Sequence, residues 1–580
     1  MINVDNLSFS FPQKELFHNI SFTLEKGQHC AFIGTSGSGK STLLEILVDP
    51  ERFSYDGVID IEPNCRIGYV SQFSKVEEKN EITVFEYIAS DFIKLQDALA
   101  SIYNEMETSG DMDALLERYQ IILDAYYAIG GDDFEQSVKK KLNMANLGKH
   151  ENLPISMLSG GEFKILQVIK EMLNSPDLLI MDEPDVFLDF ENLNSLEKLI
   201  NSHKGTLLVI THNRYLLHHC FDKILHLENM ELQEFDGKYM DYNFSLLMKK
   251  IELQELAIAD AQELERNEKL IDKLRANADV FTEASRGKAL KARIKIKERL
   301  EARRIKAPFV DIKQPNIRLA SHHGFEDATI LSVKDYSIAF DDSLLEQVSF
   351  QLKSQDKVAL IGPNGTGKTT LLRDIYQNKH SAIQIGEAVK VAYLSQNHSE
   401  LLKETNTILK EFLDAGFQTN QEVTAYLKDY GFEEEVLTQK IGSLSGGEKN
   451  LLQIAKIASV NADLLLLDEP TSHLDTYSQL SLENALRDYN GAVLMISHDF
   501  YTLANCMDYV LIIEDKAVRR MSIRKFRKMI YEKHFGRDYL ENEQRKKSAE
   551  TKIALALKDS NFTLARELSE ELEELIKLLS

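Results

Sequence analysis

The stretch Gly34-Thr-Ser-Gly-Ser-Gly-Lys40-Ser41 lies between a short apolar run, 30–33, and a helix-like segment, 41–47. A second stretch of the same kind, Gly362-Pro-Asn-Gly-Thr-Gly-Lys368-Thr369, lies between the apolar run 358–361 and the helix-like segment 369–376. A glycine-rich loop that joins a strand to a helix lets backbone N–H groups face phosphates while its lysine neutralises their charge. The chain therefore predicts two nucleotide-binding P-loops.

Each P-loop is followed by the same series of short motifs. The first series is Gln72, Leu158-Ser-Gly-Gly-Glu162, Asp182-Glu183 and His212, and the second is Gln396, Leu444-Ser-Gly-Gly-Glu448, Asp468-Glu469 and His498. In both series the serine precedes the glutamate of the acidic pair by 24 residues, and that glutamate precedes the histidine by 29. An internal repeat of this regularity indicates two tandem copies of one domain.

A continuous apolar run precedes each acidic pair, at 178–181 and 464–467, as is typical of a strand buried on both faces of a parallel sheet. The predicted fold class is α/β, with two tandem P-loop ATPase domains, a long α-helical hairpin linker between them and a C-terminal helical extension. The predicted boundaries are 1–243 for the first domain, 244–307 for the linker, 308–535 for the second domain and 536–580 for the extension.

The polar residues of the repeat suit ATP hydrolysis with Mg²⁺ as a second cofactor. Hydroxyl, amide and carboxylate oxygens are the ligands that Mg²⁺ takes beside phosphates. The predicted metal-binding residues are Ser41, Thr369, Gln72, Gln396, Asp182 and Asp468. Catalysis requires groups that orient the attacking water, accept its proton and hydrogen-bond the γ-phosphate. The predicted catalytic residues are Glu183, Glu469, His212, His498, Gln72 and Gln396.

The predicted ATP-binding residues come from the two P-loops and the two LSGGE stretches. They are Gly34, Thr35, Ser36, Gly37, Ser38, Gly39, Lys40, Ser41, Thr42, Gly362, Pro363, Asn364, Gly365, Thr366, Gly367, Lys368, Thr369, Thr370, Ser159, Gly160, Gly161, Ser445, Gly446 and Gly447. Two aromatic residues near strand ends, Phe11 and Phe340, are predicted to stack on adenine, although simple packing explains a lone aromatic residue equally well.

Bulk properties limit the class of protein. The 580 residues are 43% apolar and 28% charged, as in an ordinary soluble protein, and no apolar run reaches the length of a membrane span. The amino terminus lacks the pattern of a signal peptide. Four scattered cysteines have no metal-ligand spacing, which favours a reducing compartment. We therefore expect a cytoplasmic protein that has no membrane partner.

The net charge of −24 conceals two basic segments. Residues 281–306 carry a local charge of +7 and residues 516–547 carry +8. A charge run is commonly just a solvated helix face, but two such runs outside the motifs favour contact with a polyanion.

Two insertions stand out beside the repeat. The first copy has 38 more residues than the second between its glutamine and its LSGGE serine. They read as two helices at about 92–130, with apolar stripes at Leu95, Leu99, Ile102 and Met106 and then at Leu116, Tyr119, Leu123 and Tyr126. This region is predicted to project as an arm, the alternative being an enlarged helical subdomain. The linker reads as a helix, a break at 277–287 and a basic helix that returns to about 306.

Together, the paired P-loops and LSGGE motifs resemble the ATP-binding cassette superfamily over nearly the whole chain. The resemblance implies a head-to-tail pair within one chain, and hence a monomer, in which Lys40, Glu183 and His212 face Ser445 while the equivalent residues of the second copy face Ser159. Two cassettes, an arm and a basic linker resemble the ABC-F proteins. That family binds the ribosome near the tRNA exit and peptidyl-tRNA sites, with the linker tip, here about 277–288, directed to the peptidyl-transferase centre.

The resemblance leaves alternatives open. Ribosomal protection against antibiotics of the peptidyl-transferase centre is the leading function, and a housekeeping role on stalled ribosomes is the alternative. The ATP-binding subunit of a transporter is a weaker alternative, because it gives no reason for a basic hairpin linker. A DNA-repair or chromosome ATPase is weaker still, because those proteins carry zinc modules or very long coiled coils within a cassette and this sequence has neither. One departure bears on mechanism: Thr471-Ser472-His473 of the second copy is replaced by Asp185-Val186-Phe187 in the first. This difference predicts unequal sites, with the Lys40 site coupled less efficiently to closure.

Overall fold

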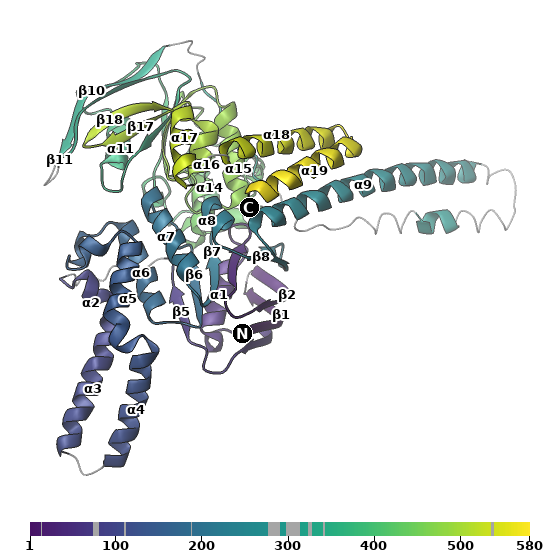
Figure 1. Ribbon diagram of the computed structural model, residues 1–580. Helices are drawn as coiled ribbons and strands as arrows, with labels where there is room; N and C mark the ends of the chain where they lie inside the picture. The colour runs from purple at the N-terminus through teal and green to yellow at the C-terminus, as the bar shows by residue number, and fades with distance from the viewer. Residues whose placement is uncertain are drawn as a thin grey trace. The chain divides into compact units, whose positions relative to one another are not determined.

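The computed structural model describes residues 1–12, 14–72, 81–108, 112–186, 188–276, 291–296, 314–322, 328–339, 343–534 and 539–579. These residues form two compact units (Figure 1). The first unit comprises Met1–Asp236 and Lys313–Met529, and it holds both copies of the repeat. The second comprises Gly237–Ile312 and Ile530–Ser580. Within the described ranges, no helix has the length and apolar character that crossing a membrane requires.

Each copy of the repeat contains one six-stranded sheet, and the two sheets share one strand order. In the first copy the order is β5 (Ile67–Val70), β6 (Leu178–Asp182), β7 (Thr206–Ile210), β3 (His29–Ile33), β8 (Lys223–Glu228) and β9 (Glu231–Asp236). In the second it is β14 (Val391–Leu394), β15 (Leu464–Asp468), β16 (Ala492–Ile496), β12 (Lys357–Ile361), β17 (Tyr509–Glu514) and β18 (Ala517–Ser522). All neighbours pair in parallel except the last pair of each sheet.

A three-stranded antiparallel sheet accompanies each large sheet. The orders are β2 (Lys14–Leu24), β1 (Ile2–Phe11), β4 (Asp56–Ile61), and β11 (Ser343–Lys353), β10 (Thr329–Ala339), β13 (Ile383–Ile385). The apolar side chains of both sheets in a copy form one core. Every residue of β6 and β15 is buried, which confirms the prediction of strands covered on both faces. The predicted α/β fold with two tandem ATPase domains is correct.

The helices of the two copies also correspond. Those that shape the sites are α1 (Lys40–Val48), α6 (Gly160–Leu173), α7 (Phe190–Ser202) and α8 (Arg214–His219) in the first copy, and α11 (Lys368–Gln377), α14 (Gly446–Ala458), α15 (Thr476–Asp488) and α16 (Phe500–Cys506) in the second. The remaining helices of the first unit include α2 (Val84–Ile88), α5 (Phe134–Met144), α12 (Ile408–Asp414), α13 (Asn420–Lys428) and α17 (Ile523–His534), which continues past the unit boundary.

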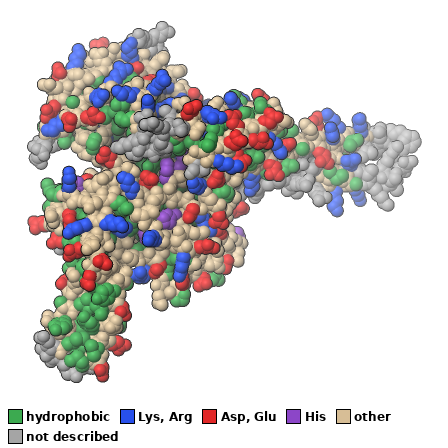
Figure 2. All heavy atoms as spheres, in the orientation of Figure 1, with side chains coloured by type: hydrophobic (Ala, Val, Ile, Leu, Met, Phe, Trp, Pro, Cys, Tyr) green, Lys and Arg blue, Asp and Glu red, His purple; other side chains and the backbone are tan. Residues whose placement is uncertain are grey.

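The extra residues of the first copy form α3 (Ser90–Thr108) and α4 (Met112–Ala128), which pack against each other. The predicted stripe on the returning helix began one residue too late, because Leu115 is buried whereas Leu116 is 50% exposed. Figure 2 shows hydrophobic side chains gathered over this helix pair. The exposed apolar residues of the pair are Tyr103, Met112, Leu116, Ile121 and Tyr127.

The second unit is helical and consists of α9 (Tyr239–Ala276), α18 (Tyr539–Lys558) and α19 (Phe562–Leu579). Met240 and Ile251 of α9 share a core with Ile553 of α18 and Leu572 of α19, so the start of the linker and the C-terminal extension fold together. Arg566 of α19 is 2.5 Å from Glu255 of α9. Residues 291–296 are helical. The predicted linker tip at 277–288 and the return helix beyond 296 lie outside the described residues.

Candidate functional site

The P-loops owe their shape to glycines at the starts of α1 and α11. Gly39 and Gly367 cap these helices with φ of 102° and 88°, a region that residues with a Cβ rarely adopt. At Gly34 a Cβ would lie 2.1 Å from the carbonyl oxygen of Leu227, so only glycine fits beside β8. The loops therefore lead directly into helix N-termini, where free N–H groups and the helix dipole favour an anion such as phosphate.

The P-loop lysines are buried inside these loops. Lys40 Nζ donates to the carbonyl oxygens of Gly34 and Thr35 at 3.0 and 2.9 Å. Lys368 Nζ donates to the equivalent carbonyls of Gly362 and Pro363 at 2.8 and 2.7 Å. Burial lowers the pKa of both lysines, and neighbouring carboxylates, Glu183 for Lys40 and Glu469 for Lys368, oppose that shift. Each ammonium group is thus held where an incoming phosphate would be neutralised.

The acidic pairs lie at the carboxyl ends of β6 and β15, beside the P-loops. Glu183 and Glu469 adopt φ of 44° and 50°, a left-handed conformation that is strained for any residue with a side chain. The same strain occurs in both copies, at the residue predicted to act on water. Backbone strain of this kind is typical of functional sites.

The aspartates of the pairs fit a divalent cation. Asp182 Oδ1 and both carboxylate oxygens of Asp468 are buried without a hydrogen-bond partner among the described residues. Burial raises the pKa of each to about 6, and the hydroxyls of Ser41 and Thr369 oppose that rise. Buried carboxylate oxygens normally have partners, and a hydrated Mg²⁺ held with those hydroxyls would provide them. The residues present therefore fit the metal.

Each LSGGE stretch folds as a helix cap. Ser159 and Glu162 form a capping box at the start of α6: Ser159 N donates to Glu162 Oε2 at 2.8 Å, and Glu162 N donates to Ser159 Oγ at 3.3 Å. Ser445 and Glu448 form the same box at the start of α14, with distances of 2.9 and 3.3 Å. The motif thus presents a serine and two glycines at a helix N-terminus, which is a second anion-binding element.

The two copies of the repeat meet head to tail across these elements. Ser445 Oγ lies 3.2 Å from Ser36 Oγ of the first P-loop, and Ser36 N donates to Asp475 Oδ2 at 3.1 Å. Reciprocally, Asn364 N of the second P-loop donates to Asp189 Oδ2 at 3.4 Å. Each nucleotide site is therefore composed of a P-loop from one copy and an LSGGE serine and an aspartate from the other.

The two sites differ in free space. A cavity of about 510 Å³ lies between the Lys368 P-loop and Ser159, Gly160 and Gly161, and it extends to Glu183, His212 and His473. Its volume is typical of small-ligand sites. Gln396, Asp468, Glu469 and His498 also line this cavity. At the Lys40 site, Ser445 instead touches the P-loop directly.

The two aromatic predictions are not tested by the structure. Phe11 lies at the end of β1 with 48% of its surface exposed, and its ring packs edge-on against Phe9 at 5.1 Å. Phe340 lies outside the described residues. Adenine stacking on either residue stays a prediction.

The predicted catalytic side chains lie together in each copy but have different partners. Gln72 Nε2 donates to Glu183 Oε2 at 2.6 Å, whereas Glu469 Oε1 is 3.5 Å from His498 Nε2. Burial lowers the pKa of His212 and His498 to about 4, so both imidazoles are neutral at pH 7.

The pKa values of the two glutamates are shifted in opposite directions. Burial raises the pKa of Glu469 to about 7. At Glu183, burial acts in the same direction, but the hydrogen bond from His473 and nearby positive charges outweigh it, and the pKa is lowered. The carboxylates of the two sites are thus held in different electrostatic environments.

The structure shows where part of the Asp185-Val186-Phe187 sequence lies. Val186 and Asp185 line the cavity at the Lys368 P-loop, and Asp189 of the same loop contacts Asn364. The loop after the first acidic pair thus contributes to the opposite nucleotide site, and Asp185 also accepts from Thr211 Oγ1 of its own copy at 2.7 Å. The predicted weaker coupling of the Lys40 site stays a prediction. Phe187 itself lies outside the described residues.

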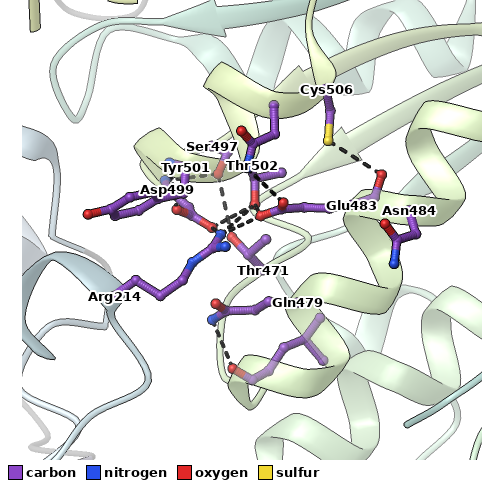
Figure 3. Close-up of polar contacts among 12 residues, drawn as sticks. Arg214, Thr471, Gln479, Glu483, Asn484, Ser497, Asp499, Tyr501, Thr502 and Cys506 are labelled. Carbon is purple, nitrogen blue, oxygen red and sulfur yellow. Dashed lines mark hydrogen bonds and ion pairs between the residues drawn. The ribbon is translucent and has the colours of Figure 1, made fainter. Parts of the chain in front are cut away.

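A buried ionic cluster that the sequence analysis missed also joins the two copies (Figure 3). Arg214, at the start of α8, contacts Glu483 of α15 and lies 2.9 Å from Asp499 Oδ2. The side chains of Arg214, Glu483 and Asp499 are only 10%, 4% and 17% exposed. Thr502 donates to both acids at 3.0 and 2.6 Å, and the guanidinium lies 4.9 Å above the Tyr501 ring. Nothing in the local sequence pattern marks Arg214, since its partners lie more than 260 residues away.

Comparisons with known proteins agree with this architecture. The family model described as ABC transporter matches residues 17–186 and 345–472. The putative ATP-binding protein YdiF of Bacillus subtilis is 30% identical, over 88% of this chain and 79% of its own length. ABC transporter F family member 5 of Arabidopsis thaliana is 28% identical, over 89% and 75%. The energy-dependent translational throttle protein EttA of Escherichia coli is 29% identical, over 87% and 90%.

Among solved structures, one titled RNase-L Inhibitor superposes with a TM-score of 0.55 over 92% of each chain, at 17% identity. That likeness concerns the fold alone. The motif pairs, the head-to-tail sites and the near full-length relatives lead to one conclusion: this chain is an ATP hydrolase of the ATP-binding cassette superfamily and belongs to its ABC-F subfamily.

Proposed function

We propose that this ATPase acts on the ribosome, with ATP binding closing the two copies on each other and hydrolysis releasing them. The observation that carries the proposal is near full-length similarity to a protein named as a translational throttle, EttA, combined with basic segments outside the ATP sites. Ribosomal RNA is a polyanion, and binding it requires Lys and Arg side chains that are exposed to solvent.

The second basic segment has the exposure that such contact needs. Arg524, Lys525 and Lys528 of α17 are exposed, as is Arg519 of β18, whose side chain is 60% accessible. By contrast, the arm helices α3 and α4 carry seven acids and only two basic residues, Lys94 and Arg118. RNA contact is therefore assigned to the linker and the 516–547 segment and not to the arm.

The geometry of each site supports the proposed cofactor roles. Mg²⁺ would be held by Asp182 with Ser41, and by Asp468 with Thr369, and it would neutralise charge on the β- and γ-phosphates. Glu183 and Glu469 orient the attacking water and accept its proton. We also propose the domain boundaries predicted from the sequence, with the arm at 92–130 and the linker at 244–307.

The ribosome assignment is tested with a variant that binds ATP without cutting it. The Glu183→Gln, Glu469→Gln double variant keeps side-chain size and is expected to stay closed in ATP and to co-sediment with 70S ribosomes in a sucrose gradient. With ADP, or after substitution of Lys40 and Lys368 by alanine in the same background, it is expected to leave the ribosomal fractions.

Two further measurements test whether the basic residues are responsible for ribosome binding. Replacing Arg524, Lys525 and Lys528 by glutamine is expected to weaken co-sedimentation and its salt dependence, since removing one phosphate contact lowers the slope against salt by about 1. A double variant that remains at the top of the gradient in ATP at every salt concentration contradicts the proposal.

We propose that the specific role is protection of the ribosome against antibiotics of the peptidyl-transferase centre. The support for this role is the resemblance to ABC-F proteins, whose linker tip is directed to that centre. Expression in a susceptible bacterium is expected to raise the inhibitory concentration of drugs that bind this centre, and the double glutamine variant is expected to give no protection. Unchanged drug susceptibility, together with ATP-dependent ribosome binding, favours a housekeeping role in translation.

A further inference from the structure

The carboxylate of Glu183 has hydrogen-bond partners from both copies of the repeat. Gln72 Nε2, from its own copy, donates to Glu183 Oε2 at 2.6 Å. His473 Nδ1, from the second copy, lies 2.9 Å from the same oxygen. Because a carboxylate oxygen only accepts, His473 Nδ1 carries the proton of this contact, and its 3.3 Å approach to Gln72 Nε2 places two donors on one acceptor.

We propose that His473 is a positioning residue supplied in trans, which holds the Glu183 carboxylate for hydrolysis at the Lys40 site and whose equivalent in the first copy is Phe187. It would fix the carboxylate against the attacking water without taking part in bond making. The inference rests on the ATP hydrolysis assigned above and is independent of the ribosome.

The loop that carries His473 is held in place from both copies. Asn450 Nδ2 of α14 donates to the carbonyl oxygens of Pro470 and Ser472 at 3.0 and 2.6 Å. Asp475 caps α15 by accepting from Ser478 N at 2.8 Å, and its other oxygen accepts from Ser36 N of the first P-loop. The imidazole is therefore delivered to Glu183 only when the second copy is docked on the first.

The LSGGE glycines make room for this loop. A Cβ at Gly447 would lie 2.5 Å from the carbonyl oxygen of His473, and one at Gly446 would lie 3.2 Å from its ring. His473 has φ of 60° and its side chain is only 6% exposed, so its backbone and ring are both confined. A strained, buried residue aimed at a reacting group is more consistent with function than with simple packing.

The Lys368 site has a different arrangement. Glu469 Oε2 accepts from His498 N at 3.3 Å, and Glu469 Oε1 is 3.5 Å from His498 Nε2, both contacts within one copy. The residue of the first copy that corresponds to His473 is Phe187, whose side chain has no hydrogen-bonding group. The sequence thus provides an imidazole in trans for one site only.

The test separates the two sites by removing one glutamate at a time. In a Glu469→Gln background only the Lys40 site is expected to turn over, and His473→Ala is expected to lower its kcat about 10- to 100-fold, the size of effect that misplacing a reacting group produces. KM for ATP is expected to change less than about twofold, because His473 touches the carboxylate and not the P-loop lysine. His473→Asn, whose Nδ2 replaces the Nδ1 donor, is expected to restore most of kcat.

The matched control is His473→Ala in the Glu183→Gln background, where the contact has already been removed. His473 also lines the cavity at the Lys368 P-loop, so the substitution is expected to lower turnover there, but by a smaller factor than in the Glu469→Gln background. Equal losses in both backgrounds would assign His473 to general closure, and no loss in the Glu469→Gln background would overturn the proposal. All assays are run without ribosomes, so either result leaves the ribosome proposal standing.

If Glu469→Gln alone stops all turnover, the kinetic test has no signal to measure. A spectroscopic measurement then tests the contact between His473 and Glu183. In protein labelled with ¹⁵N-histidine, the His473 ring is expected to carry a proton on Nδ1, and Glu183→Gln is expected to shift its Nδ1 resonance. Glu469→Gln is expected to leave that resonance in place. A His473 ring that is indifferent to Glu183→Gln would overturn the proposed contact.

Discussion

Replacing both Glu183 and Glu469 by glutamine is expected to reduce steady-state ATP hydrolysis about 10²- to 10⁴-fold, the contribution that a positioned general base makes. Glutamine keeps the shape of the side chain but does not accept the proton of the attacking water. Both glutamates are buried at strand ends in the same strained conformation, so nothing else in the described part of the sites takes over their position. The measurement is phosphate release under saturating Mg²⁺ and ATP.

The control for that variant is Glu387→Gln, which removes an exposed carboxylate from a turn outside the sites and is expected to leave turnover unchanged. Retention of more than about a tenth of wild-type turnover by the double variant would contradict the assignment of these residues. The single variants are expected to differ from each other, because the two carboxylates have different partners and opposite pKa shifts. Identical residual rates would argue for equivalent sites.

Arg214→Met is expected to destabilise the closed pair of copies by about 3–5 kcal/mol, the loss typical of a buried ion pair deprived of one partner. Glu483 and Asp499 would remain buried as uncompensated charges, and opening of the interface, which returns them to water, would become easier. The expected result is faster amide hydrogen exchange in α16, measured in ATP on the double glutamine background, where closure is otherwise maintained.

Two controls distinguish this effect from a general loss of stability. Adding Glu483→Gln and Asp499→Asn to Arg214→Met removes the buried charges, keeps a capping side chain at 499, and is expected to restore slow exchange. Arg66→Met breaks an exposed pair with Asp177 and is expected to change stability by less than about 1 kcal/mol. Slow exchange in Arg214→Met itself would show that the cluster does not hold the interface.

Much of the site could be predicted because its parts are local. The P-loop glycines, the buried runs before the acidic pairs and the LSGGE capping boxes each depend on contacts within a few residues or on one periodic pattern. The matched spacing of the two copies then established the tandem fold. The apolar stripe of the arm was less well determined, since adjacent leucines at 115 and 116 satisfy a helical pattern almost equally.

The partners across the interface could not be predicted in the same way. His473 stands at a position where the two copies differ, which marks it as unusual, but only docking shows that it contacts Glu183, 290 residues away. The same holds for Arg214 with Glu483, and for the link between α9 and the C-terminal helices. The sequence alone determined two ATP-binding domains, their motifs and their chemistry, because these are encoded by short-range spacing. Only the tertiary structure decided which loop serves which site, because contacts between distant segments leave no periodic trace along the chain.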